Sequence, residues 1–134
     1  MRELELTNRI QAVSKIPLIV SMDAEWGVAM RLDSTLAFPR AMTLGALDEK
    51  YDSLIFQMGE EIALQCKRLG IYLNYAPVVD VNNNKNNPVI NFRSFGEDKE
   101  KVVRKSWMYL SGMQSQGVWG CIKHFPGHGD TDVD

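Results

Sequence analysis

The chain has 134 residues, of which 45% are hydrophobic and 24% charged, and these values are typical of a globular protein and exclude disorder and coiled coil. Its net charge of -2 and its scattered basic residues offer no basic face to a phosphate backbone, so a nucleic-acid partner is not expected. No apolar run approaches the roughly 18 residues of a membrane span. We therefore expect a soluble protein, located in the cytoplasm or, if an upstream signal was lost, in the periplasm or outside the cell.

The first predicted strand covers residues 16–22 (IPLIVSM) and ends at Asp23. An amphipathic helix is predicted over residues 48–69, because its apolar residues recur mostly at three- and four-residue spacing. Gly70 follows this helix as its expected C-terminal stop. The first half of the chain therefore contains one strand followed by one long helix.

The second half of the chain repeats this order. A second strand is predicted over residues 71–81 (IYLNYAPVVDV), and the asparagine-rich loop over residues 82–87 follows it. A second helix is predicted over residues 98–116, with Asp98 at or near its N-cap. The third strand is predicted over residues 117–122 (GVWGCI).

Alternating strands and helices predict a parallel α/β sheet with right-handed crossovers. The three predicted strands end at Asp23, near Asp80, and at Lys123 with His124, so these polar residues are expected at one edge of the sheet. In the alternative interpretation, Asp23 and Asp80 only cap the segments that follow them. This alternative is weaker for Asp23 than for Asp80.

The last twelve residues, KHFPGHGDTDVD, contain both histidines and three aspartates. A solvated terminus is one interpretation, but the apolar strand directly before the segment favours a functional site. Asp130, Asp132 and Asp134 alternate like the first ligands of a calcium loop. We do not expect a metal site, because no predicted helix precedes this loop, and we expect no cofactor.

Several other residues are expected to be structural. Cys66 and Cys121 are predicted to be buried free thiols, because they are far apart and lack metal-site spacing. Trp107 and Trp119 are expected in the core. For Trp26, stacking on a sugar and packing inside the protein are both open.

Four segments, taken in chain order, carry a resemblance to a known family. The segments MDAEWG, YAPVVDV, NFRSFGED and KHFPGHGDTDVD are similar to those of glycoside hydrolase family 3, in its β-N-acetylglucosaminidase branch. The resemblance implies that residues 1–134 are a fragment of the N-terminal (β/α)8, TIM-type barrel domain, with about three parallel strands and two intervening helices. A complete barrel typically needs about 250 residues.

The resemblance also implies which residues contact the sugar. Hydroxyl groups of a pyranose are held well by charged donors and acceptors, because such hydrogen bonds are the stronger ones. The alternative for the arginine among them is a surface ion pair with the neighbouring Glu97 or Asp98. The residues that match the sugar-binding positions of the family are Asp23, Arg93, Lys123 and His124.

Asp134 matches the aspartate that, in this branch, orients a histidine acting as general acid/base. That histidine and the nucleophilic aspartate have no counterpart in the 134 residues. A retaining glycosidase needs both an acid/base and a nucleophile. The resemblance therefore implies a retaining exo-β-N-acetylglucosaminidase as the parent protein, with this fragment inactive alone.

Three further expectations remain open. The parent could instead be a family 3 β-glucosidase or a glycosyl phosphorylase, or the chain could be a non-catalytic carbohydrate-binding fragment. The substrate is expected to be a small carbohydrate, and its exact identity, such as a muropeptide or a chitin fragment, is open. A three-stranded parallel sheet has two bare edges, so we expect it to pair with the remainder of a barrel or with another copy of itself.

Overall fold

The protein is described by a computed structural model that covers residues 2–134. In chain order, its helices and strands are α1 (Arg2–Val13), β1 (Ser21–Met22), α2 (Ala41–Gly45), α3 (Asp52–Arg68), β2 (Leu73–Asn74), α4 (Lys99–Ser115) and β3 (Trp119–Gly120). Short 3-10 turns occur at Val28–Met30, Glu49–Tyr51 and Asn91–Arg93. The three strands form a parallel sheet in the order β1-β2-β3, as the alternation of strands and helices predicted.

The strands are much shorter than the sequence predicted. Only two residues of each strand belong to the ladder, and Ser21, Leu73 and Trp119 lie side by side in register. Beyond the ladder, pairing resumes only at an isolated bridge between Val78 and Lys123. Pro77 explains the interruption after β2, because proline has no backbone N–H to donate to a neighbouring strand.

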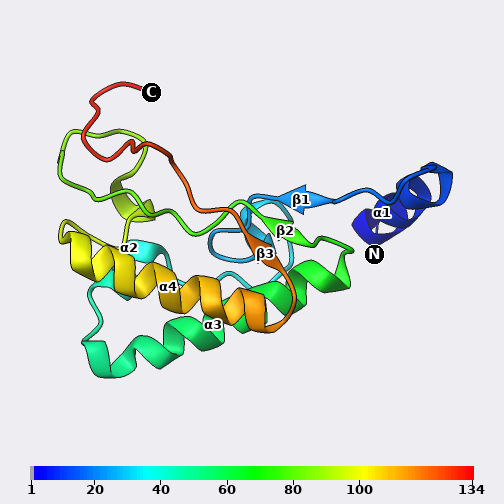
Figure 1. Cartoon of the computed structure of the whole chain (residues 1–134), viewed down its shortest axis with the longest axis horizontal. Helices are drawn as coiled ribbons and strands as arrows, with labels where there is room; N and C mark the ends of the chain where they lie inside the picture. Colours follow the sequence, from blue (N-terminus) through cyan, green and yellow to red (C-terminus); the bar gives the residue numbers. More distant parts are fainter. Residues whose placement is uncertain (1) are drawn as a thin grey trace.

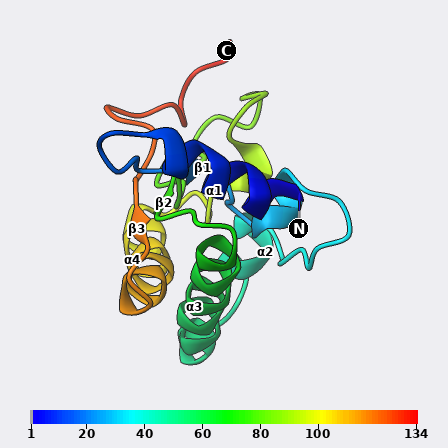
Figure 2. The ribbon, with the colours of Figure 1, turned by 90° about the vertical axis from the view of Figure 1, so that its right-hand side faces the viewer.

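Helices α3 and α4 run side by side and cover one face of the sheet (Figures 1 and 2). Their backbones approach closely at two glycines. A Cβ atom on Gly59 would lie 2.4 Å from the carbonyl oxygen of Tyr109, and one on Gly112 would lie 2.0 Å from that of Phe56. The absence of side chains at these two positions therefore sets the distance between the helices.

The main core lies between these two helices and the sheet. Its fully buried apolar side chains include Ile55, Ile62, Val102, Met113 and Val118. Asn74 of β2 is buried among them, and its carboxamide pairs with both backbone groups of Ala24, at 2.9 Å to N and 3.2 Å to O. This polar contact ties the loop after β1 to the central strand.

The two long helices agree closely with the sequence prediction. The segment predicted as the first helix forms a 3-10 turn followed by α3, and α4 begins after Asp98, whose side chain accepts a hydrogen bond from Lys101 N at 2.7 Å. Helix α1 was not predicted, although Leu6, Ile10 and Val13 recur at four- and three-residue spacing; these side chains are exposed, and the helix buries no residue. It is attached to the end of α3 by the Thr7 hydroxyl, which donates to Leu69 O at 2.9 Å.

Three predictions of burial were wrong. Cys121 is exposed, and Trp107 and Trp119 are 63% and 62% exposed, because they lie on the outer side of α4 and on the edge strand β3. Cys66 is buried as predicted, and burial raises the pKa of its thiol to about 11, so it is an unreactive thiol. Within residues 2–134, no helix is both long and apolar enough to cross a bilayer.

Candidate active site

Side chains from the loops after β1 and β3 meet at one edge of the sheet. The Lys123 ammonium lies between two carboxylates, 2.9 Å from Asp23 Oδ1 and 2.7 Å from Glu25 Oε1. Arg31 holds the other oxygen of Asp23 at 2.7 Å. Asp23 therefore binds two cationic side chains. The alternative interpretation, in which Asp23 only caps the segment that follows it, is wrong.

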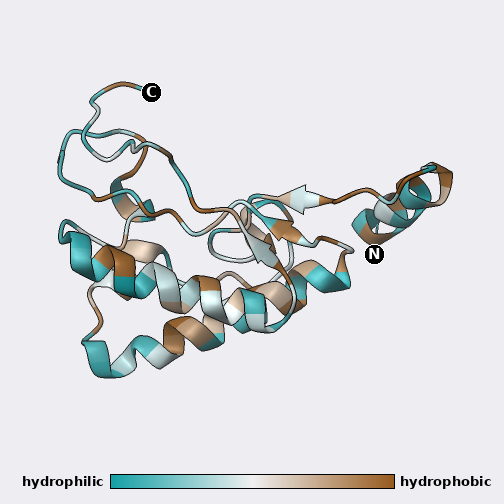
Figure 3. Ribbon diagram, viewed as in Figure 1, coloured by the Kyte–Doolittle hydropathy of each residue, from teal (hydrophilic) through white to brown (hydrophobic). Residues whose placement is uncertain are grey.

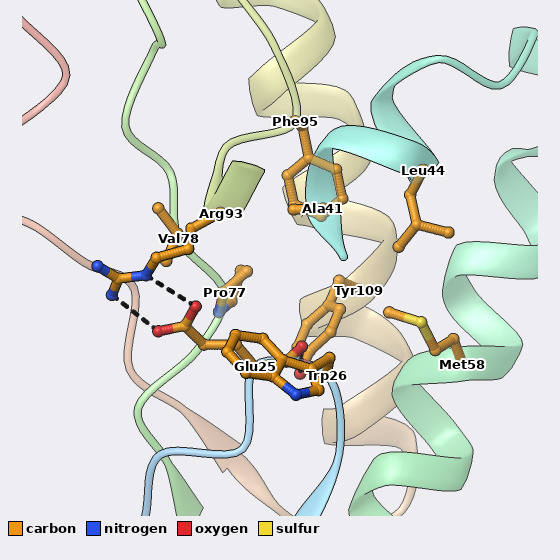
Figure 4. A pocket seen from close by; sticks show the side chains of 10 residues that line it. All are labelled: Glu25, Trp26, Ala41, Leu44, Met58, Pro77, Val78, Arg93, Phe95 and Tyr109. Atoms are coloured by element: carbon orange, nitrogen blue, oxygen red, sulfur yellow. Dashed lines mark hydrogen bonds and ion pairs between the residues drawn. The ribbon is translucent and has the colours of Figure 1, made fainter. Parts of the chain in front are cut away.

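Arg93 joins this group from the 3-10 turn that precedes α4. Its Nε donates to Glu25 Oε2 at 3.1 Å and its Nη2 donates to Glu25 Oε1 at 2.8 Å, which gives the paired geometry shown in Figure 4. The alternative pairing of Arg93 with Glu97 or Asp98 is therefore wrong. We call Asp23, Glu25, Arg93 and Lys123 the charge cluster.

The two carboxylates of the charge cluster are held in their ionised form. Burial alone would raise the pKa of Glu25, but hydrogen bonds from Arg93 and Lys123 outweigh it and lower the pKa below its ordinary value. Burial likewise opposes ionisation of Asp23, and hydrogen bonds from Lys123 and Arg31 lower its pKa overall. The hydrogen bond to Glu25 in turn raises the pKa of Arg93. Both carboxylates of the charge cluster are therefore more readily ionised than an ordinary carboxyl group.

Asp80 organises the chain after β3. Its Oδ2 accepts from the backbone N–H of His124 at 3.1 Å and lies 2.6 Å from His124 Nδ1, while its Oδ1 accepts from the N–H of His128 at 2.7 Å. An ionised carboxylate only accepts hydrogen bonds, so Nδ1 of His124 carries the proton and Nε2 is the ring nitrogen available to a ligand. Asp80 therefore binds the loop after β3. The interpretation in which Asp80 only caps the segment that follows it is also wrong.

The final segment lies beside this loop. His128 Nδ1 is 2.6 Å from the Thr131 hydroxyl, and His128 Nε2 is 3.8 Å from Asp134 Oδ1. The side chain of Asp134 is 88% exposed. Asp134 therefore sits next to His128 at the surface, outside the charge cluster.

Trp26 is half-buried and packs on an arginine. The guanidinium carbon of Arg40 is 3.8 Å from the centre of the Trp26 ring and 4.4 Å from that of Phe92. Trp26 also borders a cavity of about 20 Å³ together with Met58 and Tyr109, which Figure 4 shows beside the pair of Glu25 and Arg93. A cavity of this size has room for about one water molecule, so it is not a sugar site.

Among the residues that the structure describes, no three His, Cys, Asp or Glu side chains are grouped so that they could hold a metal ion.

The structure brings Asp23, Arg93 and Lys123 together and places His124 directly after them in the chain, held by Asp80. Sequence reasoning missed Glu25, although it belongs to the same MDAEWG segment as Asp23. It also gave too little weight to Asp80. The usable signal for Asp80 was a lone carboxylate at the end of an apolar run, where burial requires hydrogen-bonding partners.

Comparison with known proteins identifies the family. The family model for the glycosyl hydrolase family 3 N terminal domain matches residues 2–134. The chain belongs to glycosyl hydrolase family 3. The resemblance stated from the four segments is thereby confirmed, together with the parallel α/β architecture of its relatives.

Among its relatives in family 3, beta-hexosaminidase A of Pseudoalteromonas piscicida is 38% identical, and the match covers 98% of this chain and 23% of that protein. A family 3 beta-N-acetylglucosaminidase from Paenibacillus sp. str. FPU-7 superposes with a TM-score of 0.91 at 37% identity, over 99% of this chain and 26% of that one. The beta-glucoside phosphorylase BglX superposes with a TM-score of 0.93 at 32% identity, over 99% of this chain and 24% of that one. The chain thus spans about a quarter of the length of these relatives.

Proposed function

We propose that this chain is part of a retaining exo-β-N-acetylglucosaminidase of family 3 and that residues 1–134 form part of its N-terminal barrel domain. Asp23, Arg93, Lys123 and His124 hold the terminal sugar. Catalysis also needs a general acid/base and a nucleophile on opposite sides of the sugar. We assign these two groups to residues outside the 134, with Asp134 orienting the acid/base histidine.

One observation supports this proposal above the others. Lys123 bridges Asp23 and Glu25, and Arg93 holds Glu25, so charges of alternating sign lie at the carboxyl ends of parallel strands, where α/β proteins bind ligands. The Lys123 and Asp23 side chains are 15% and 33% exposed, which leaves polar atoms accessible to sugar hydroxyls. Relatives described as beta-hexosaminidase and beta-N-acetylglucosaminidase make N-acetylglucosaminides the favoured substrates.

A chromogenic N-acetyl-β-glucosaminide tests the proposal. The assay compares the 134-residue chain with a protein extended through the downstream region of its gene. We expect turnover in the extended protein and none in the short chain, because Asp134 alone orients a base but cannot replace it. Turnover in the short chain, or its absence in both proteins, would contradict the assignment.

Phosphorolysis is the second candidate reaction, and the similarity to a beta-glucoside phosphorylase supports it as an alternative to hydrolysis. The product decides between the two reactions. In phosphate buffer, a hydrolase releases the free sugar, whereas a phosphorylase releases the sugar 1-phosphate. If calorimetry shows that the extended protein binds N-acetylglucosamine without any turnover, the third candidate, a carbohydrate-binding role, holds.

The bare edges of the sheet are proposed to pair with the remainder of the barrel or, in the isolated chain, with a second copy. Exposed apolar side chains lie along the edge strand β3 and the outer side of α4, namely Trp119, Ile122, Val103 and Trp107. Apolar surface of this kind is normally covered by neighbouring elements.

A further inference from the structure

The asparagine-rich loop after β2 holds the segment that leads to Asp134. Asn87 is only 1% exposed, and its Nδ2 donates to His128 O at 2.6 Å and lies 3.3 Å from the Thr131 hydroxyl. Its Oδ1 accepts from the N–H groups of Val89 and Ile90 at 2.8 and 2.7 Å. Both polar atoms of this buried side chain are therefore hydrogen-bonded. The oxygen binds the turn that follows Asn87, and the nitrogen binds the segment that contains His128 and Thr131.

Asn84 makes a second connection of the same kind. Its Nδ2 donates to the carbonyl groups of Asp130 and Thr131, at 3.2 and 3.0 Å, while its Oδ1 accepts from the N–H of Asn86 at 3.0 Å. Both asparagines thus use the oxygen to shape their own turn and the amide NH2 to reach across to residues 128–131. We call residues 127–131 the His128 loop.

The backbone of the His128 loop fits closely against Val81, in the extended chain that follows β2. Gly129 is buried, and a Cβ atom at this position would lie 1.8 Å from the carbonyl oxygen of Val81. The N–H of Asn84 also donates to Gly129 O, at 3.3 Å. The His128 loop is therefore seated on the loop after β2 by backbone contact as well as by the two side chains.

We propose that Asn84 and Asn87 are positioning residues, which dock the His128 loop and so fix the path of the chain into Asp134. This inference rests on the proposed function, because Asp134 acts on catalysis only if it orients an acid/base. Positioning matters for a proton donor, since a displacement of about 1 Å can cost roughly 100-fold in rate. Of the proposed sugar-binding residues, Lys123 is held by Asp23 and Glu25 and His124 by Asp80 Oδ2, so neither is bonded to Asn84 or Asn87, although Asp80 Oδ1 also accepts from His128 N.

Substitution of asparagine by aspartate separates the two uses of each side chain. Aspartate keeps the oxygen that shapes the local turn, but it loses the NH2 donor and places an oxygen against the carbonyl group of His128 or of Thr131. Asn86→Asp is the matched control. It lies in the same loop, adds the same charge, and its exposed side chain makes no hydrogen bond among residues 2–134.

The docking itself is tested by hydrogen exchange in the 134-residue chain. We expect Asn87→Asp and Asn84→Asp to speed exchange of the His128 amide, which is bonded to Asp80, by on the order of 10-fold or more relative to Asn86→Asp. The amides of α3 and α4 should exchange as in the unsubstituted chain. Equal exchange of the His128 amide in all three variants would overturn the proposal. Should Asn87→Asp fail to fold, the more exposed Asn84→Asp decides.

The catalytic consequence is tested in the extended protein with two N-acetyl-β-glucosaminides, one with a good leaving group and one with a poor one. We expect Asn87→Asp to lower kcat by on the order of 10-fold or more for the poor leaving group, which depends on acid catalysis, and much less for the good one. KM should stay nearly unchanged. An equal loss with both substrates, or a rise in KM alone, would show a general structural defect and overturn the positioning role.

The two proposals fail in different ways. If the extended protein turns over neither substrate, the proposed function fails, and the hydrogen-exchange result alone decides whether Asn84 and Asn87 dock the loop. If the extended protein is active and Asn87→Asp matches Asn86→Asp in both kinetics and exchange, the proposed function survives and the docking inference fails.

Discussion

Glu25 and Asp80 are the two side chains that connect the strand-end loops into one site. Glu25 receives hydrogen bonds or ion pairs from residues on two other loops, Arg93 and Lys123. Asp80 receives three N–H groups from His124 and His128. Both are largely or fully buried, so their partners replace the water that a free carboxylate would need. Each carboxylate therefore fixes the relative positions of loops that are far apart in the sequence.

Substitution of Asp80 tests this role at the scale of one residue. Asparagine keeps one oxygen and replaces the other by an NH2 group, so at least one of the N–H groups of His124 and His128 would face a donor. Leaving a buried donor unpaired costs about 1 to 3 kcal/mol, and we expect the free energy of unfolding to fall by this amount. Urea denaturation measures it. Asp33→Asn, at an exposed position, is the control, and an equal effect of both substitutions would contradict the argument.

The sequence predicted the positions of Lys123, His124 and Asp23 better than those of the two connecting carboxylates, Glu25 and Asp80. Lys123 and His124 directly follow an apolar strand, which gave their position at the sheet edge, and Asp23 was recognised for the same reason. Glu25 could not be recognised from periodicity, because it lies in a loop and its importance depends on Arg93, which is 68 positions away in the chain. The contact between such distant residues follows from the three-dimensional arrangement of the loops.

At the scale of elements, the pair of α3 and α4 determines how the sheet is covered. Gly112→Ala tests their close approach. Alanine favours a helix over glycine by about 1 kcal/mol, but the added Cβ would meet backbone that is 2.0 Å away. Overpacking of this kind costs about 1 to 3 kcal/mol, so we expect a net loss of stability in thermal unfolding. Gln114→Ala, at an exposed position of the same helix, should leave stability nearly unchanged.

A buried ion pair also joins these helices. The Lys105 ammonium is fully buried and donates to Asp52 Oδ1 at 2.6 Å and to Leu47 O at 3.1 Å. Burial would raise the pKa of Asp52, but hydrogen bonds from Lys105 and Arg104 outweigh it and lower the pKa below 3.8. A carboxyl group whose pKa is lower in the folded state stabilises the fold above its unfolded pKa, and this stabilisation disappears as the pH falls through the folded value.

Lys105→Met tests this pair. We expect the substitution to cost about 3 kcal/mol near neutral pH, because the buried carboxylate of Asp52 loses a partner. The variant should also lose less stability than the unsubstituted protein between about pH 6 and about pH 3, since the pKa of Asp52 is no longer held as low. Denaturation across this pH range measures both effects. Parallel pH profiles would show that Lys105 does not hold the pKa of Asp52 down.

The elements differed in how well they could be predicted. Helices α3 and α4 are amphipathic or carry a cap signal, so their positions followed from spacing and from Asp98. The strands were predicted too long, because an apolar run shows burial or extension but does not show where a neighbouring strand donates hydrogen bonds. Helix α1 was missed although Leu6, Ile10 and Val13 recur at helical spacing, and in the structure these apolar side chains are exposed on a helix that buries no residue.

At the scale of the whole molecule, one side is well packed and the other is bare. Helices α3 and α4 cover one face of the sheet, while the apolar segment before β1 runs uncovered toward α1 (Figure 3). Leu18 and Ile19 in this segment are 44% and 62% exposed. Exposed strand segments and apolar patches of this kind favour association with other chains.

We therefore expect the isolated 134-residue chain to self-associate. Combined substitution of Trp107→Gln and Trp119→Thr removes two of the largest exposed apolar side chains and should increase the fraction of monomer. Sedimentation velocity measures this fraction. Leu36→Thr, at an exposed loop position away from the strand edges, is the control, and a similar gain of monomer in the control would show that the effect is not specific to β3 and α4.

The contacts of the middle strand also bear on how this protein could be recombined with its relatives. From one stretch of chain, Asn74 binds the loop before it in sequence, whereas Asp80 and Asn87 bind the loop after β3. A single strand-helix unit exchanged between two family members would have to match its neighbours on both sides at these positions. A single crossover between residues 75 and 79 leaves each of these contacts within one parent, so such chimeras should fold, whereas a crossover in the exposed stretch 33–37 separates Ala24 from Asn74 and should give less stable proteins.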